Sequence, residues 1–114
     1  MKNVAARRAW LNRYRQALKT ESALSDRIGQ AEEAPAAWRE RLALQVVKGF
    51  AIRREIEQAI EALPDAMQVC VLRYRFLACM TAGQTARELG LTVGHTNRIQ
   101  AAALDALTVP GVQG

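Results

Sequence analysis

Two polar side chains near the C-terminal end of the chain, His95 and Arg98, have the chemistry needed to hold a nucleic acid. The planar guanidinium of an arginine can donate two hydrogen bonds to the O6 and N7 atoms of guanine, which discriminates against other bases by about 1–3 kcal/mol. An imidazole donates well to a phosphate, above all when it is protonated. The same side chains also occur on surfaces that bind nothing, so the surrounding segment must decide between the two interpretations.

The surrounding segment, residues 81–107, has the pattern of a helix-turn-helix. Thr81 and Gln84 have the spacing of a capping box, in which each side chain satisfies a backbone N–H of the other residue. Gly90 suits the left-handed residue that ends a helix, and Thr92 is a second candidate N-cap. We therefore expect two short helices that cross steeply, with the outer face of the second free to enter a major groove. Any small all-helical protein contains such pairs, so this pattern alone leaves the function open.

The distribution of charge favours contact with phosphates. The 114 residues have a net charge of +5, and residues 1–20 contain six basic side chains and no acidic one. Arg7, Arg8 and Arg13 are candidates for a phosphate patch without sequence preference, although a solvated helix face is the commoner reason for such a run. The other candidate contacts to double-stranded DNA are Arg73, Arg75, Arg87, Thr92, His95, Asn97 and Arg98.

Enzymatic and metal chemistry finds little support in the composition. One histidine and two cysteines, Cys70 and Cys79, are too few for a zinc site or a disulfide framework. The sequence has no glycine-rich phosphate loop and offers no evident pair of nucleophile and base. We expect no enzymatic activity, no catalytic residues, and neither a metal nor another cofactor.

Length and hydropathy patterning predict an all-α fold of modest size. Half of the residues are hydrophobic, only three are proline, and no stretch alternates apolar and polar residues as a strand would. No apolar run is long enough to span a membrane, and the N-terminal segment lacks the apolar centre of a signal peptide. We expect a cytoplasmic protein that makes no membrane contact.

Two long amphipathic helices are predicted over residues 4–28 and 36–63, with a break marked by Gly29 and Pro35. Such a pair either folds back as a hairpin or extends to pair with another chain. Its long apolar stripes favour a homodimer through this part of the chain. The residues expected in the hairpin core or the dimer interface are Trp10, Tyr14, Trp38, Leu42 and Ile56.

A third helix is expected over residues 65–79, before the helix-turn-helix. The chain then divides into three parts. Residues 1–63 form an N-terminal helical hairpin, residues 64–107 form a helix-turn-helix domain, and residues 108–114 form a flexible tail.

The stretch LPDAMQVCVLRYRFLACMTAGQTARELGLTVGHTNRIQAAALDAL, residues 63–107, resembles region four of bacterial sigma factors. The shared pattern is a leucine-proline pair, a helix with valine-leucine-arginine, and a helix-turn-helix that ends in alanine-leucine. With its opening WLNRYR at residues 10–15, the whole chain resembles the small sigma-like regulators of phages and prophages of the ArpU and RinA type. The resemblance implies a transcription regulator that binds promoter DNA and contacts RNA polymerase.

The resemblance also shows where this chain departs from the family pattern. Val93 and Gly94 stand where the family has long polar side chains that meet base edges. Of the positions that read bases in the family, only Arg98 is retained, while His95 and Asn97 match positions that approach phosphates. Direct base reading is therefore expected to be weak.

Two buried positions of the helix-turn-helix depart from the pattern as well. Thr85 and Thr96 occur where the family has aliphatic residues between the two helices. The hydroxyl of Thr85 can be satisfied by a backbone carbonyl one turn earlier, so the fold is expected to survive with less stability.

Three classes of function remain open on the sequence. The first is a DNA-binding regulator of the phage sigma-like type. The second is a small protein-interaction module, an inhibitor or adaptor of a host protein such as RNA polymerase or a defence nuclease, built on a degenerate helix-turn-helix. The third is a mainly structural helical dimer. The salt dependence of binding to duplex DNA separates the first class from the other two.

Overall fold

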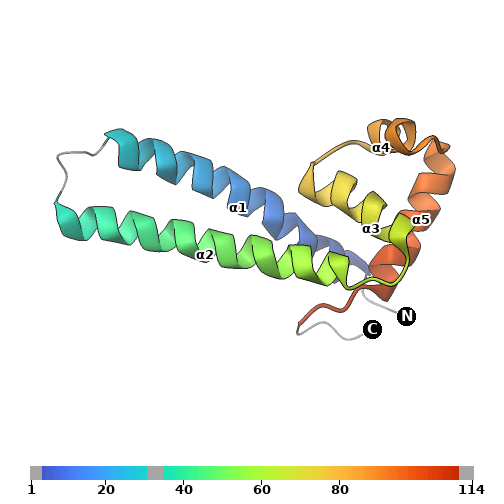
Figure 1. The fold of residues 1–114 in the computed structure, drawn as a ribbon, viewed down its shortest axis with the longest axis horizontal. Coiled ribbons are helices and arrows are strands. Elements are labelled where there is room, and N and C mark those ends of the chain that lie inside the picture. The colour runs from blue at the N-terminus through green and yellow to red at the C-terminus, as the bar shows by residue number, and fades with distance from the viewer. Residues whose placement is uncertain (1–3, 31–34, 111–114) are drawn as a thin grey trace.

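The computed structural model describes residues 4–30 and 35–110, and within these ranges the fold is all-α, as predicted. The long helices α1 and α2 run antiparallel side by side, and the shorter helices gather at the end of this pair that lies away from the α1–α2 connection (Figure 1). The elements in order are α1 (Val4–Gln30), α2 (Ala36–Glu61), α3 (Ala66–Leu72), the π-helical turn η1 (Arg73–Leu77), α4 (Ala82–Leu89) and α5 (Val93–Ala106).

The hairpin closes within the chain, because apolar side chains of α1 and α2 pack against each other. Leu11 on α1 and Ile56 and Ile60 on α2 are fully buried. The two helices also approach closely at Gly49, where a Cβ atom would lie 3.1 Å from Cγ of Glu21. The sequence pattern allows pairing within or between chains, and the structure has the first arrangement.

The ends of the long helices lie within two residues of the predicted ends. Helix α1 continues one residue past Gly29, and α2 ends two residues before Leu63. Leu63 precedes a proline, which disfavours helical geometry in the residue before it. The side chain of Ile28 and residues 31–34 of the predicted break lie outside the described residues.

The third predicted helix is not a regular α-helix over its whole length. The Asp65 carboxylate caps α3 and accepts hydrogen bonds from two backbone N–H groups of the first turn, at 2.9 and 3.2 Å. The chain then widens into η1, where the N–H of Ala78 donates to the carbonyl of Arg73 at 3.0 Å. Helical structure ends at Leu77, and Cys79 follows with a left-handed φ of 56°.

One core joins the hairpin to the C-terminal helices. It packs the first half of α1 and the second half of α2 against α3, η1 and α5. The buried members of this core are Trp10, Leu11, Tyr14, Ile56, Ile60, Leu63, Leu72, Phe76, Ala103, Leu104, Leu107 and Val109. The helix-turn-helix is therefore held on the hairpin by shared apolar side chains.

Two expectations about buried residues need correction. Trp38 is not in the core: it is 41% exposed, because it lies in the first turn of α2, at the end of the hairpin far from the packed helices. The tail predicted to be flexible begins at Thr108, but its second residue, Val109, is buried against the core. Residues 111–114 lie outside the described part of the chain. The other predicted hairpin residues, Trp10, Tyr14, Leu42 and Ile56, are buried.

Candidate nucleic-acid interface

Helix α4 has both of its predicted ends. The hydroxyl of Thr81 accepts a hydrogen bond from the N–H of Gln84 at 3.1 Å, and the Gln84 side chain accepts one from the N–H of Thr81 at 2.9 Å. This reciprocal pair is the predicted capping box. At the other end, Gly90 has a left-handed φ of 68°, which ends the helix as expected.

Helix α5 begins at the predicted cap. The hydroxyl of Thr92 accepts a hydrogen bond from the N–H of His95 at 3.1 Å. Behind the two helices, the side chains of Thr85 and Thr96 are fully buried. Their hydroxyls donate at 2.9 Å to the backbone carbonyls of Thr81 and Thr92, one turn earlier. The expectation for Thr85 is confirmed, and Thr96 uses the same device.

The outer face of α5 carries the polar residues predicted to contact DNA. His95, Asn97 and Arg98 are all exposed. Helical spacing places Gly94, Arg98 and Ala101 along the middle of this face, with His95 on one side and Asn97 on the other. The face therefore has one long basic side chain at its centre, between two small residues.

The guanidinium of Arg98 is not used in an ion pair within the described part of the chain, where the ion pairs are Arg53–Glu21 and Arg73–Glu61. Arg98 and His95 line a shallow pocket of about 370 Å³ together with the N-terminal end of α3. The Asp65 carboxylate in this pocket already accepts hydrogen bonds from the α3 backbone. Arg98 is thus an exposed side chain beside the N-terminal end of α3.

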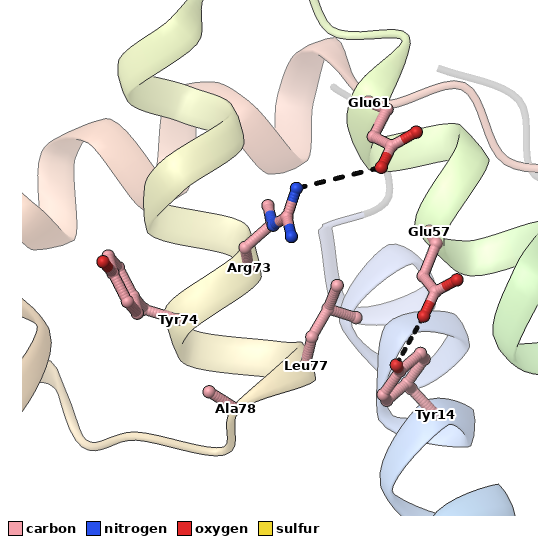
Figure 2. A pocket seen from close by; sticks show the side chains of 7 residues that line it. All are labelled: Tyr14, Glu57, Glu61, Arg73, Tyr74, Leu77 and Ala78. Carbon is pink, nitrogen blue, oxygen red and sulfur yellow. Dashed lines mark hydrogen bonds and ion pairs between the residues drawn. The ribbon is translucent and has the colours of Figure 1, made fainter.

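The other predicted DNA-contacting arginines lie in different surroundings. Arg73 points to the hairpin, with its Nη1 3.8 Å from Oε1 of Glu61 (Figure 2). Arg75 is half-buried: its Nε donates to Oε1 of Gln100 on α5 at 2.8 Å, and its Nη1 donates to the carbonyl of Met80 at 2.6 Å. Of these three, Arg87 on α4 is the exposed arginine that belongs to the helix-turn-helix itself. Arg75 fastens η1 to α5, whereas Arg73 lies near Glu61 at the end of α2.

The three arginines of the predicted phosphate patch near the N-terminus do not form one surface. Arg7 is only 4% exposed, and its Nε donates to the carbonyl of Leu107 at 3.1 Å, so this residue fastens α1 to the end of α5 and cannot meet a phosphate. Arg8 and Arg13 are exposed, but their five-residue separation places them on different sides of α1. The burial of Arg7 had a signal in the sequence, because it shares a helical face with Leu11 and Tyr14.

A polar cluster in the hairpin was not predicted from the sequence. Arg53 forms two contacts with the carboxylate of Glu21, at 2.6 and 3.0 Å, and its guanidinium lies over the ring of Phe50. The Tyr14 hydroxyl donates to Oε1 of Glu57 at 2.7 Å, beside a pocket of about 480 Å³ between the hairpin and η1 (Figure 2). These residues hold α1 to α2.

The two ionisable groups at the centre of this cluster have shifted pKa values. Burial raises the pKa of the Tyr14 phenol, and the hydrogen bond to the Glu57 carboxylate raises it further. The hydrogen bonds to Glu21 raise the pKa of Arg53, which keeps this side chain charged. The cluster is therefore an ion pair and a neutral phenol at physiological pH, an arrangement that suits a structural role.

No grouping of three or more histidine, cysteine, aspartate or glutamate residues that could hold a metal ion is present among the described residues. None of the described helices is long and apolar enough to cross a membrane. Comparison of the chain with protein-family models, with curated proteins and with solved structures finds no match.

Proposed function

We propose that this protein is a DNA-binding transcription regulator whose helix α5 lies in the major groove of promoter DNA. The observation that carries the proposal is the capped α4–α5 pair, which exposes Arg98 at the middle of the outer face of α5. Helices α3 and α4 both pack against α5, and the face with Arg98 is exposed beside the N-terminal end of α3, where it can approach base edges. Arg98 reads a base in this proposal, while His95 and Asn97 contact phosphates.

We propose in addition that the protein is sigma-like, of phage or prophage origin, and acts on promoters in the cytoplasm in contact with RNA polymerase. The order of the elements supports this extension, since a leucine-proline pair precedes α3 and α3 packs beneath the helix-turn-helix. The small side chains at Gly94 and Ala101 limit the number of bases that α5 reads. Selectivity is expected near the low end of the roughly 10³- to 10⁷-fold range of specific binders.

The acting form in this proposal is a homodimer joined through the outward face of α2. Leu44, Val47 and Phe50 follow one another on this face and are 61%, 61% and 56% exposed. Leu44 and Val47 lie opposite the buried face of α2, which contains Leu42 and Ile56, and Phe50 lies at the flank between the two faces. A second copy would cover this apolar stripe and present a second α5 to a neighbouring half-site, as in other dimeric helix-turn-helix proteins.

A second candidate function is a protein-interaction module that inhibits or adapts a host protein such as RNA polymerase or a defence nuclease. The exposed stripe of Leu44, Val47 and Phe50 favours it, because contiguous apolar surface commonly marks a protein contact. The exposed apolar side chain of Val93 on α5 also favours a contact with another protein. In this function the helix-turn-helix would not read DNA.

Binding to a library of mixed duplexes over a range of salt concentrations tests the proposal. For a DNA-binding protein, the logarithm of the affinity falls linearly with the logarithm of the salt concentration, with a slope of about 0.9 for each phosphate contacted. The selected sequences should prefer guanine at one position, and Arg98→Ala should relax that preference at a cost of about 1–3 kcal/mol. The matched control is Arg54→Ala, which removes one exposed arginine from α2 and should leave the preference unchanged. Absence of salt-dependent duplex binding would favour the protein-interaction module.

A further inference from the structure

One side of α1 carries a row of polar and basic residues, of which the predicted patch included only Arg8. Arg8, Asn12 and Arg15 are spaced by four and three residues, and Lys19 continues the row by four more. All four are exposed and lie on the same side of the helix. At a rise of about 1.5 Å per residue, the row extends over about 16 Å.

The first three residues of the row also line a cleft. This cleft, of about 410 Å³, lies where α1 meets η1, the segment that leads into α4, and the middle of α5. Arg8 and Arg15 form its α1 side, and Arg75 and Gln100 lie across from them. Thr81, the cap of α4, completes it.

The charged side chains that line the cleft are all positive. Three arginines line it, and no acidic residue is among the described residues of its lining. The carboxylates in the ion pairs of the described chain, Glu21 and Glu61, belong to the hairpin cluster and to Arg73. Arg75 is fixed by its bonds to Gln100 and Met80, so one of the three guanidinium groups is already in position for an anion.

We propose that this cleft and the row beyond it bind the phosphate backbone of the DNA that flanks the base pairs met by α5. The inference rests on the proposed function and extends it, because it makes the hairpin part of the DNA interface. Two observations favour a DNA backbone over a free phosphate ion. The row continues to Lys19, well past the cleft, and the cleft adjoins the start of α4, the helix that crosses the backbone in helix-turn-helix complexes.

The test compares the full-length protein with an Arg8→Ala/Arg15→Ala variant on two duplexes. One duplex covers only the base pairs protected by α5, and the other extends further on both sides. The variant should bind the short duplex as the unchanged protein does. On the extended duplex, the slope of log affinity against log salt should fall by about 1.8, because two phosphate contacts are lost.

Arg13→Ala is the matched control, since Arg13 is an exposed arginine on another side of the same helix and lies outside the cleft. Its slope should equal that of the unchanged protein. Both substituted residues of the double variant are exposed, so its thermal unfolding should be unaltered, which the same samples can confirm.

Three results would overturn the inference. If the double variant keeps the full slope on the extended duplex while Arg98→Ala still alters base preference, the row is not in the interface and the proposed function stands. If Arg13→Ala lowers the slope by about half as much as the double variant does, the effect is one of net charge alone. If inorganic phosphate binds in a manner that requires Arg8 and Arg15 but no duplex binds, the cleft holds a free anion and both proposals fail.

Discussion

At the scale of single residues, two residues with a left-handed backbone conformation, Gly90 and Cys79, follow helical segments of this protein. Gly90 ends α4 with a φ of 68°, which costs glycine little because it has no Cβ. Cys79 follows η1 with a φ of 56°, and the N–H of Met80 closes the turn on the carbonyl of Tyr74 at 2.9 Å. Cys79 thus occupies a left-handed position after a helix that glycine usually takes, at a cost of about 1–2 kcal/mol.

We predict opposite effects of exchanging the side chains at these two positions. Cys79→Gly should raise the free energy of unfolding by about 0.5–1 kcal/mol, because relief of the left-handed strain exceeds the entropy that glycine adds to the unfolded chain. Gly90→Ala should lower it by about 1 kcal/mol, and no atom lies within 4 Å of the added Cβ to alter that result. Denaturant unfolding measures both.

The control for this pair is Gly94→Ala in the first turn of α5, where the added Cβ also meets open space but the backbone is helical. This variant should be as stable as the unchanged protein or slightly more stable. A loss of stability in Cys79→Gly would show that the cysteine side chain makes a contact worth more than the strain.

At the scale of elements, the hairpin combines an apolar core with polar residues that fix how α1 lies on α2. The bidentate contact of Arg53 with Glu21 is half-buried, and Glu21 lies at the close approach of the helices beside Gly49. Such pairs add little net stability over apolar residues, but removing one partner leaves a costly unpaired charge. Together with Tyr14 and Glu57, they define the register of the two helices.

The hydrogen bond between Tyr14 and Glu57 predicts a pH dependence of stability. Because folding raises the pKa of Tyr14 above its unfolded value of about 10, its contribution is fully present below that pH and is lost as the pH rises through the folded pKa. Tyr14→Phe should therefore lower the free energy of unfolding by about 1 kcal/mol at neutral pH. The difference between the two proteins should shrink above about pH 10.

Unfolding of both proteins across this range, with absorbance of the phenolate recorded in parallel, measures the effect. A difference that stays constant up to high pH would mean that the lost stability comes from packing of the ring and not from the neutral hydroxyl.

Features that depend on neighbouring residues could be predicted from the sequence, and features that depend on distant segments could not. The caps at Thr81, Gly90 and Thr92 were predictable, because capping involves side chains and backbone groups within a few residues of one another. The π-helical turn and the Arg75–Gln100 bond were not, since they depend on contacts between distant segments. The number of basic residues near the N-terminus suggested one patch of arginines. Helical periodicity places these arginines on different sides of α1.

At the scale of the whole molecule, burial divides the apolar residues of α2 into two faces. Leu42, Ile56 and Ile60 face α1 and the core, whereas Leu44 and Val47 face outward. One chain thus completes its own hairpin and still has an apolar stripe left over. The homodimer proposed from the stripes of the sequence would therefore form on the outward face.

We predict that Val47→Asp and Leu42→Asp will act differently. Val47→Asp should turn a dimer into a folded monomer, because the charge is solvated in the single chain but buried in the dimer. Leu42→Asp should unfold the hairpin, since Leu42 is buried within the chain. Analytical ultracentrifugation and circular dichroism distinguish the two outcomes. A monomer at high micromolar concentration in the unchanged protein would remove the dimer.

The central claim is that α5 reads DNA, and footprinting of the His95→Ala/Asn97→Ala/Arg98→Ala variant on the preferred duplex tests it most directly. All three side chains are exposed, so the variant should unfold as the unchanged protein does. The account predicts that protection of the preferred site disappears, while weak binding through other basic residues persists at low salt. A footprint that survives all three substitutions would contradict the account and would assign the helix-turn-helix to contact with another protein.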